Sequence, residues 1–337
     1  MSVNKPVVTE DLKIFAKQTS DEVENAMRSD LDQTLQATDP LLREVLTHSL
    51  FNGGKRVRPM LVILASRICG KNDQALLRLA AAFEYLHVAT LIHDDVIDGA
   101  AERRGRPSLV QSHGIAAAIL TGDWLHARSM QLISEIAGEH ALNIFCRATT
   151  GMVDGEYLQI RHTGNIAITE EQYFSIIERK TGGLIASACE IGAIYSSASE
   201  PQRRALASYG NNLGIAFQVI DDLLDYLGDQ KSTGKKIGQD LVEGKITLPL
   251  IRTLAKAAPE DLSLLQNLFD DPAKREAHFP EIKNIITQNG GFDSALATAV
   301  KSVRNAVDAL TIFDEKPMDS SRAMLEGLAH YVISRKK

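Results

Sequence analysis

Hydrophobic residues recur at spacings of three and four along most of this chain. Leu76, Leu79, Phe83 and Leu86 show the pattern clearly, and this spacing places side chains on one face of an α-helix. Convincing period-two strands with hairpin turns are absent. The one ambiguous apolar run, Leu61–Leu64, has neighbours that favour a helix. The pattern therefore predicts an all-α protein.

Helix start and stop signals agree with this periodicity. Starts are expected at Asp39-Pro40, Thr169-Glu170-Glu171, Ser199-Glu200-Pro201 and Ala258-Pro259-Glu260-Asp261, and stops at Gly70, Gly164 and Gly228. Long helices are predicted over 72–98, 108–136, 169–196 and 201–227. Several are hydrophobic on most faces, which is typical of the central helices of a large bundle with an elongated cavity between them.

The chain is expected to form a single domain over residues 1–337. No linker rich in Pro, Gly or Ser interrupts residues 54–250, and the apolar content of 44% is ordinary for a globular core. Residues 1–36 predict a polar amphipathic helix, and residues 258–337 predict peripheral helices.

Composition excludes several classes of protein. The net charge of −6 argues against a general nucleic-acid binder. Cys69, Cys146 and Cys189 lack disulfide or metal-ligand spacing and are interpreted as reduced core thiols. The start of the chain lacks the apolar region of a signal peptide, and no run approaches 18 apolar residues. A soluble, cytoplasmic protein is expected.

The most informative motif is an acidic pentad that occurs twice, as Asp94-Asp95-Val96-Ile97-Asp98 and Asp221-Asp222-Leu223-Leu224-Asp225. Residues four apart lie about 40° from one another around a helix and roughly 6 Å along it, so each copy presents its first and last carboxylate on one face. A single such cluster is usually a solvated helix face. Two copies, each interrupting an apolar segment, instead suggest bound Mg²⁺, which carboxylates hold together with substrate phosphates.

Basic segments lie close to these motifs in the sequence. Glu102-Arg103-Arg104-Gly105-Arg106-Pro107 follows the first motif, and the guanidinium fork suits phosphate oxygens. Asn52-Gly53-Gly54-Lys55-Arg56-Val57-Arg58-Pro59 is a second candidate phosphate cradle at a predicted loop-to-helix junction. Two facing acidic motifs with two sets of cations indicate a polyphosphate substrate.

Taken in order, the segments GGKRVRP, HDDVID, RRG, KTGG, FQVIDDLLD, TGKK and DLVEGKITLPL resemble the trans-isoprenyl diphosphate synthases, above all the long-chain polyprenyl diphosphate synthases. The resemblance is strong over residues 40–250. It implies a Mg²⁺-dependent prenyltransferase that condenses isopentenyl diphosphate with an allylic diphosphate such as farnesyl or geranylgeranyl diphosphate. It also implies a homodimer.

The resemblance implies about three Mg²⁺ ions, bound by Asp94, Asp98 and Asp221. Asp95, Asp222 and Asp225 have supporting roles, and Asp225 is also a candidate metal ligand. The implied contacts to the allylic diphosphate are Arg103, Lys180, Thr181, Gln218 and Lys235. The implied isopentenyl diphosphate pocket comprises Lys55, Arg58, His87 and Arg104, and Lys245 is a further candidate phosphate contact. Taken alone, His87 and Gln218 could equally be core residues, and Lys180-Thr181 a helix-surface pair.

The implied chemistry needs no protein nucleophile. Breaking the allylic C–O bond leaves a carbocation and diphosphate, so metals and cationic side chains stabilise the charge that develops on the leaving group. The double bond of isopentenyl diphosphate then attacks, and loss of a proton regenerates an allylic diphosphate that is five carbons longer. The family suggests that released diphosphate accepts this proton.

Product length is predicted from the helix before the first motif. Thr90 and Ala89 lie four and five residues before Asp94, about 6 to 7.5 Å along a helix, and both are small. Short-chain members of the resembled family commonly have aromatic residues near this point. A product of about C40 is therefore expected, within C30 to C50, with Met130 on the next helix as a candidate for the cavity floor.

Four alternatives remain open: a shorter-chain synthase, a terpene cyclase, a noncatalytic subunit of a heteromeric synthase, and a purely structural helical protein. The complete second acidic motif and both basic clusters disfavour the cyclase, and the intact aspartates disfavour the noncatalytic subunit. A long prenyl product is amphiphilic, so transient membrane contact or transfer to a quinone-ring prenyltransferase is expected.

Overall fold

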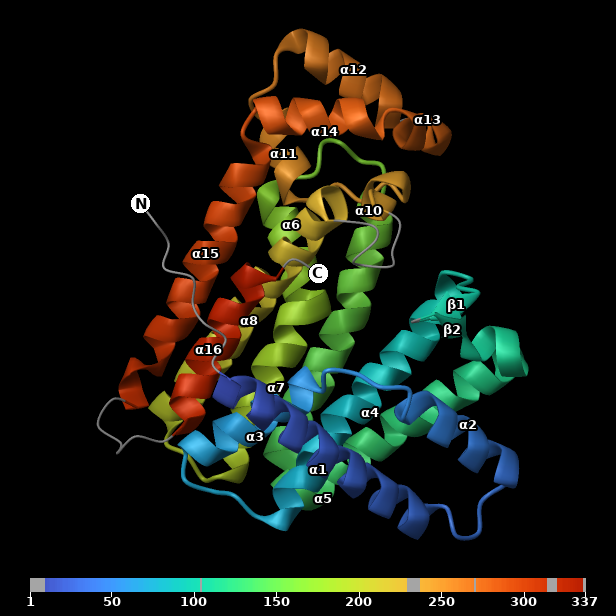
Figure 1. The fold of residues 1–337 in the computed structure, drawn as a ribbon, viewed down its shortest axis with the longest axis vertical. Helices are drawn as coiled ribbons and strands as arrows, with labels where there is room; N and C mark the ends of the chain where they lie inside the picture. Colours follow the sequence, from blue (N-terminus) through green and yellow to red (C-terminus); the bar gives the residue numbers. More distant parts are fainter. Residues whose placement is uncertain (1–9, 104, 229–236, 270, 314–319, 336–337) are drawn as a thin grey trace.

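The computed structural model describes residues 10–103, 105–228, 237–269, 271–313 and 320–335. Almost all of its regular structure is helical (Figure 1), as the sequence predicts. The exception is a two-stranded antiparallel ribbon of β1 (Glu102–Arg103) and β2 (Arg106–Pro107). The sequence predicts only an arginine-rich turn there, and strands of two residues are too short to show a periodicity.

Central helices build the bundle around one continuous hydrophobic core. They are α3 (Val57–Ile68), α4 (Gln74–Ile97), α5 (Leu109–His162), α7 (Gly183–Tyr195), α8 (Glu200–Leu227) and α15 (Gly291–Ala309). In Figure 1, α1 (Glu10–Thr34) crosses the bundle at the end opposite to α12 (Pro259–Phe269), α13 (Pro272–Ala277) and α14 (Phe279–Gln288). The remaining elements are α2 (Pro40–Leu50), α6 (Glu170–Ile177), α10 (Gln239–Val242), α11 (Leu248–Leu254), the 3₁₀ turn Leu310–Phe313 and α16 (Ser320–Ser334).

Helix α4 occupies the middle of the bundle and carries the first acidic motif at its C-terminal end. Asp73 caps its N-terminus by accepting a hydrogen bond from the Leu76 backbone N–H at 3.1 Å. Among the described helices, α4 alone is long and apolar enough to cross a membrane by length and composition, but 67% of its most apolar window is buried. Its hydropathy therefore reflects a core position.

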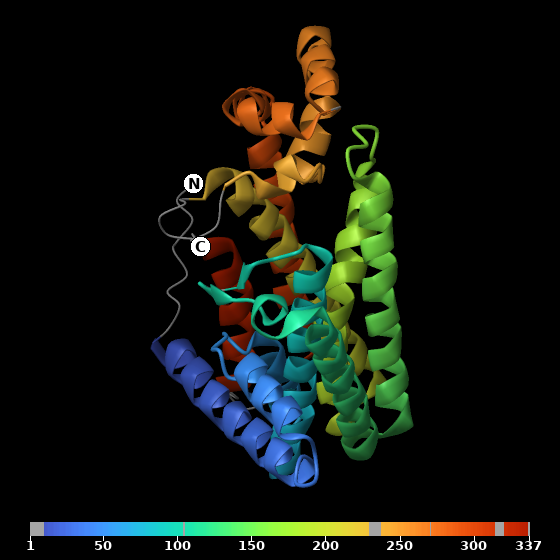
Figure 2. The same cartoon turned by 90° about the vertical axis from the view of Figure 1, so that its right-hand side faces the viewer.

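The long helix α5 has non-helical backbone at Gly114, near its start, and at Gly138, which divides it into two halves. The backbone of Gly138 has φ 80° and ψ −178°, which is not helical, and the chain turns sharply there, as Figures 1 and 2 show. The predicted helix over 108–136 corresponds to the first half. The sequence predicts the end of the second half, which reaches His162 close to Gly164, but it predicts no range for this half. The second half contributes side chains to the site described below.

A π-helical turn, η1 (Glu178–Gly182), divides the helix predicted over 169–196 into α6 and α7. Such turns insert an extra residue into a helix and are frequent at functional sites. This one contains Lys180 and Thr181. Gly214 allows the close approach of α8 to this turn, because a Cβ at Gly214 would lie 2.6 Å from the Gly182 Cα.

The predicted helix ends are confirmed. Helix α2 begins at Pro40, α6 follows the N-cap Thr169, and α8 follows the N-cap Ser199. The ambiguous run Leu61–Leu64 lies within α3. Helices α3, α5 and α8 end within two residues of Gly70, Gly164 and Gly228.

The C-terminal segment contains two kinds of helix. Helices α12 to α14 project from one end of the bundle in Figures 1 and 2. Helix α15, in contrast, packs along α8 and buries Ala295, Ala299 and Val303. The segment expected to be peripheral therefore includes a helix of the core.

Helices α4 and α5 approach closely at Gly122. A Cβ built on Gly122 would lie 2.2 Å from Nε2 of His93, the residue immediately before Asp94. We expect Gly122→Ala to lower the free energy of unfolding by about 1–3 kcal/mol, because the added methyl group overpacks this contact. Urea denaturation followed by circular dichroism measures the effect.

Gly151→Ala is the matched control, since Gly151 lies in the helical second half of α5 and a Cβ there meets nothing within 4 Å. The higher helix propensity of alanine should raise the free energy of unfolding of this variant by about 0.5–1 kcal/mol. Equal destabilisation by both substitutions would contradict the close-packing argument.

Candidate active site

The first acidic motif separates its carboxylates between two environments. Asp94 and Asp98 are exposed, whereas Asp95 is buried. Arg103 of β1 donates hydrogen bonds from Nε to both carboxylate oxygens of Asp95, at 2.7 and 2.8 Å, and its Nη2 lies 2.7 Å from Oδ1. The ribbon thus neutralises Asp95, and the first and last carboxylates of the motif remain accessible.

The second motif, at the end of α8, is arranged similarly. Asp221 is exposed, whereas the buried Asp222 accepts hydrogen bonds from Tyr173 Oη at 2.5 Å and from Gln218 Nε2 at 2.9 Å. Thr181 of the π turn donates to Gln218 Oε1 at 3.1 Å. Two predicted substrate-binding residues, Thr181 and Gln218, are therefore brought together with Asp222.

Asp225 has a structural contact in addition to its predicted metal role. Its carboxylate accepts hydrogen bonds from the backbone N–H groups of Gln239 and Asp240, at 3.1 and 3.2 Å, at the start of α10. Desolvation and the charge of Asp240 raise the pKa of Asp225 to about 6, although these two hydrogen bonds lower it. The second motif is thereby fixed to α10.

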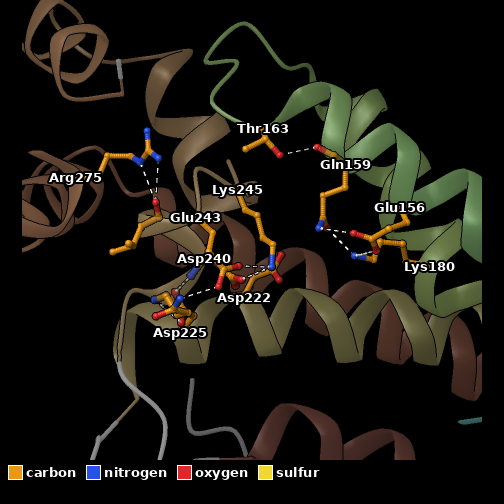
Figure 3. A network of polar contacts seen from close by, with 12 residues as sticks. Glu156, Gln159, Thr163, Lys180, Asp222, Asp225, Asp240, Glu243, Lys245 and Arg275 are labelled. Carbon is orange, nitrogen blue, oxygen red and sulfur yellow. Dashed lines mark hydrogen bonds and ion pairs between the residues drawn. The ribbon is translucent and has the colours of Figure 1, made fainter. Parts of the chain in front are cut away.

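Two further segments contribute lysines, Lys180 and Lys245, and Figure 3 shows each of them beside acidic side chains. Lys180 forms an ion pair with Glu156 of α5 and donates to Gln159 Oε1 at 2.9 Å. Lys245, which follows α10, lies 2.7 Å from Glu243 Oε2 and 3.4 Å from Asp240 Oδ1. Each lysine therefore has a carboxylate partner.

The electrostatic interactions connect the two motifs. Desolvation raises the pKa of Asp94, and Lys180 opposes this shift while Glu156 raises it further. Desolvation also raises the pKa of Asp98, and here Lys245 is the main opposing charge. Lys245 also pairs with Asp240, whose backbone N–H bonds to Asp225 of the second motif, so this lysine links the surroundings of the two motifs.

Burial affects the supporting groups more strongly. It raises the pKa of Asp222 to about 8, and the charge of Asp240 acts in the same direction. Burial alone would lower the pKa of Lys245, but the carboxylates of Asp240 and Glu243 raise it above its ordinary value. The excess of negative charge favours binding of a cation, and the positive charge of Lys245 favours a phosphate group beside it.

The donor set fits Mg²⁺ shared with a substrate. Within the described ranges, no three acidic, histidine or cysteine side chains converge closely enough to hold a metal by themselves. Mg²⁺ is commonly bound by one or two carboxylates, with phosphate oxygens and water completing the octahedron. The exposed carboxylates of Asp94, Asp98 and Asp221, on two helices, are of this kind.

The predicted isopentenyl diphosphate residues lie near α3 and α4. Lys55 is exposed and lies over the ring of Tyr331, 5.8 Å from its centroid. Arg58 and His87 are half-buried, and burial lowers the pKa of Arg58. Arg104 and Lys235 lie outside the described residues, so their predicted roles are not placed.

The predicted chain-length residues lie where helices pack together. Ala89 is 2% exposed, and Thr90 is half-buried and donates to the His87 carbonyl at 2.8 Å. Met130 packs against the hydrophobic core. The contacts of these residues are compatible with an apolar wall beyond the first acidic motif.

Sequence reasoning missed several polar residues of this site. Glu156 and Gln159 lie three apart and so share a helix face, but the sequence predicts no range for the helix that carries them. Glu243 and Asp240 occur within the segment DLVEGKITLPL, next to the predicted Lys245. Tyr173 and Arg335 gave no signal; Arg335 reaches Asp221 at 3.5 Å from the end of α16.

Tyr173→Phe tests the support of the second motif. The substitution removes the donor to the buried Asp222 carboxylate, and we expect the free energy of unfolding to fall by about 1–3 kcal/mol. Chemical denaturation provides the measurement. Tyr157→Phe is the control, because Tyr157 is 71% exposed. An equal effect of the two substitutions would argue against the Tyr173–Asp222 hydrogen bond.

The chain is similar to known proteins over nearly its whole length. The polyprenyl synthetase family model matches residues 39–286. Octaprenyl diphosphate synthase from Haemophilus influenzae is 34% identical over 301 residues, 89% of this chain and 90% of that protein. Heptaprenyl diphosphate synthase component 2 from Geobacillus stearothermophilus is 33% identical over 310 residues, 92% of this chain and 95% of that protein.

Solved structures have the same fold. A polyprenyl synthase from Caulobacter crescentus, complexed with calcium and isoprenyl diphosphate, superposes with a TM-score of 0.86 at 34% identity, covering 97% of this chain and 98% of that one. A decaprenyl diphosphate synthase from Rhodobacter capsulatus has a TM-score of 0.88 at 33% identity, covering 97% and 99%. The chain therefore belongs to the polyprenyl synthetase family and is a polyprenyl diphosphate synthase, a prenyltransferase of isoprenoid biosynthesis.

Proposed function

We propose that this protein condenses isopentenyl diphosphate with an allylic diphosphate, farnesyl or geranylgeranyl diphosphate, to a long-chain all-trans polyprenyl diphosphate of about C40. The octaprenyl relative supports this length. Relatives named for heptaprenyl and decaprenyl products are about equally similar, so product analysis has to decide the length. The product would supply a quinone side chain.

One observation carries the proposal: the charge of Lys245 acts on the first acidic motif, and the same lysine pairs with a carboxylate whose residue contacts the second motif. The positive charges of Lys245 and Lys180 lower the pKa of Asp98, at the end of α4. Lys245 also pairs with Asp240, whose backbone N–H donates a hydrogen bond to Asp225 of the second motif. Such an alternation of acids and bases suits a diphosphate bound through metal ions on one side and lysines on the other.

In this mechanism Asp94, Asp98 and Asp221 would hold Mg²⁺, with Asp225 as a further ligand. When bound, the metal supplies electrostatic stabilisation of the leaving diphosphate. Lys180, Arg103, Lys235 and Lys245 would bind the allylic diphosphate, and Thr181 with Gln218 would position it. Asp95 and Asp222 would orient this set through their own hydrogen bonds.

The second substrate would bind through Lys55, Arg58, His87 and Arg104. These residues would hold the isopentenyl diphosphate so that its double bond faces the allylic carbon, which lowers the entropic part of the barrier. The acceptor of the released proton would be the diphosphate product, since diphosphate remains beside the reacting carbon.

We also propose a homodimer of single-domain, cytoplasmic subunits. The first half of α5 supports an interface, because Ile115, Ile119 and Leu120 are 57%, 41% and 65% exposed, and exposed apolar patches often mark protein interfaces. Release of the amphiphilic product would involve transient contact with a membrane.

The direct test is incubation with farnesyl diphosphate, isopentenyl diphosphate and Mg²⁺, followed by mass analysis. We expect products centred on C40, and no turnover when a chelator removes the metal. Asp98→Asn should lower kcat/KM about 100-fold or more, because it removes charge that the leaving-group site requires. Asp293→Asn, an exposed carboxylate in α15, is the control. Metal-independent turnover would refute the proposal.

Ala89→Phe tests the control of product length. A ring at this buried position should obstruct growth of the prenyl chain and shift the products toward shorter lengths. Ala297→Phe, at an exposed position of α15, is the control and should leave the product distribution unchanged. If Ala89→Phe folds, as judged by thermal denaturation, and still makes the same products, the steric argument is wrong.

A further inference from the structure

The short helix α10 carries part of the site, yet it has only four residues. A helix of this length has no stability of its own, because the cost of nucleation exceeds what one turn returns. Tertiary contacts must therefore fix Asp240 within α10 and Glu243 and Lys245 directly after it. Asp225 of α8 binds the first N–H groups of α10. Further contacts at both ends of α10 come from the C-terminal cap, defined here as α12, α13 and α14.

Arg275 of α13 contacts the C-terminal end of α10, and Arg275 is only 5% exposed. Its guanidinium donates to the Val242 carbonyl from Nη2 at 2.9 Å and from Nε at 3.3 Å. Nη1 donates to the Phe269 carbonyl at 2.7 Å. Figure 3 shows Arg275 reaching toward the segment that bears Glu243.

These two carbonyls are the last of α10 and of α12. The final carbonyl groups of a helix have no partner within it, and a cation placed there also interacts favourably with the helix dipole. Arg275 therefore joins two helix C-termini through one planar group. A lysine could not reproduce this geometry, because a single ammonium lacks the fork of donors.

At the N-terminal end of α10 the contact is Phe279 of α14. Gly238, the N-cap of α10, has φ 78°, and a Cβ there would lie 2.5 Å from the Phe279 ring. Phe279 also stacks on Tyr226 of α8, with ring centroids 6.1 Å apart. The cap thus contacts α10 at both ends.

The residues fixed in this way face the two acidic motifs. The backbone N–H groups at the start of α10 bind Asp225. Lys245 pairs with Asp240 and Glu243 after the chain turns at Gly244, whose carbonyl accepts from the Gly164 N–H at 2.8 Å. A displacement of Val242 would therefore be transmitted to Lys245 within three residues.

We propose that Arg275 is a positioning residue for the diphosphate site. By holding the Val242 carbonyl, it keeps Glu243 and Lys245 between the two acidic motifs, so the C-terminal cap controls the affinity of the site although it contributes no ligand. This inference rests on the proposed function, which assigns Lys245 to diphosphate binding.

Amide hydrogen exchange tests the anchoring step without any assay of activity. We expect Arg275→Met to accelerate exchange at Gly244 and Lys245, whose N–H groups bond to the Leu241 and Asp240 carbonyls, with amides of α4 unchanged. Lys274→Met is the matched control, because Lys274 is an exposed neighbour in α13. Exchange that increases throughout the protein would show a general loss of stability and would overturn the proposal.

Titration calorimetry with inorganic pyrophosphate and Mg²⁺ tests the functional step. We expect the Kd to rise about tenfold in Arg275→Met and to remain within about twofold in Lys274→Met. Because Arg275 acts through Lys245, the double variant Arg275→Met with Lys245→Met should bind no more weakly than Lys245→Met alone. Additive losses, or wild-type affinity in Arg275→Met, would overturn the proposal.

Arg275→Lys provides a second variant if Arg275→Met does not fold. It keeps the charge but loses the forked geometry, so it should show the same local acceleration of exchange, and the proposal fails if it does not. Failure of the wild-type protein to bind pyrophosphate with Mg²⁺ would instead count against the proposed function. Wild-type binding with an unaffected Arg275 variant would count against this inference alone.

Discussion

The desolvation and mutual repulsion of carboxylates gathered at the ends of two helices form the constraint on which the rest of this site depends. Desolvation raises the pKa of Asp94, Asp98, Asp222 and Asp225 alike, so each charge requires a compensating partner. The protein compensates the inner carboxylates with its own groups, through Arg103 at Asp95 and Tyr173 with Gln218 at Asp222. Asp94 and Asp98 remain exposed, and Asp221 is exposed although it lies 3.5 Å from Arg335. These are the carboxylates that a divalent cation would share with a phosphate group.

The same requirement explains why polar residues from distant parts of the chain converge here. Lys180 is held by Glu156 and Gln159 on the second half of α5, and Lys245 by Asp240 and Glu243 near α10. These pairs orient the lysines before a ligand arrives, which reduces the reorganisation that binding requires. A ligand, however, has to compete with these carboxylates for the lysine ammonium groups. An arrangement of this kind favours highly charged ligands such as diphosphates.

The regular helices α4 and α8 carry the acidic motifs, and irregular parts of the bundle supply the lysines of the site. The sharp turn at Gly138, the π turn that bears Lys180 and the four-residue helix α10 all depart from regular helix. Each departure aims side chains that a continuous helix would direct elsewhere. The C-terminal cap belongs to this group, because Arg275 and Phe279 fix α10 from outside the bundle.

The sequence by itself determined the helical class, most helix ends and the paired acidic motifs, because these depend on local periodicity, capping residues and spacing within one or two turns. It also placed Lys180, Thr181, Gln218 and Lys245 in the candidate site through their family pattern. Only the tertiary structure decided which carboxylates are neutralised, and by which partners. Tyr173 meets Asp222, Glu156 meets Lys180 and Arg275 meets Val242 across long stretches of chain. Such contacts depend on how helices pack, and no local pattern in the chain encodes them.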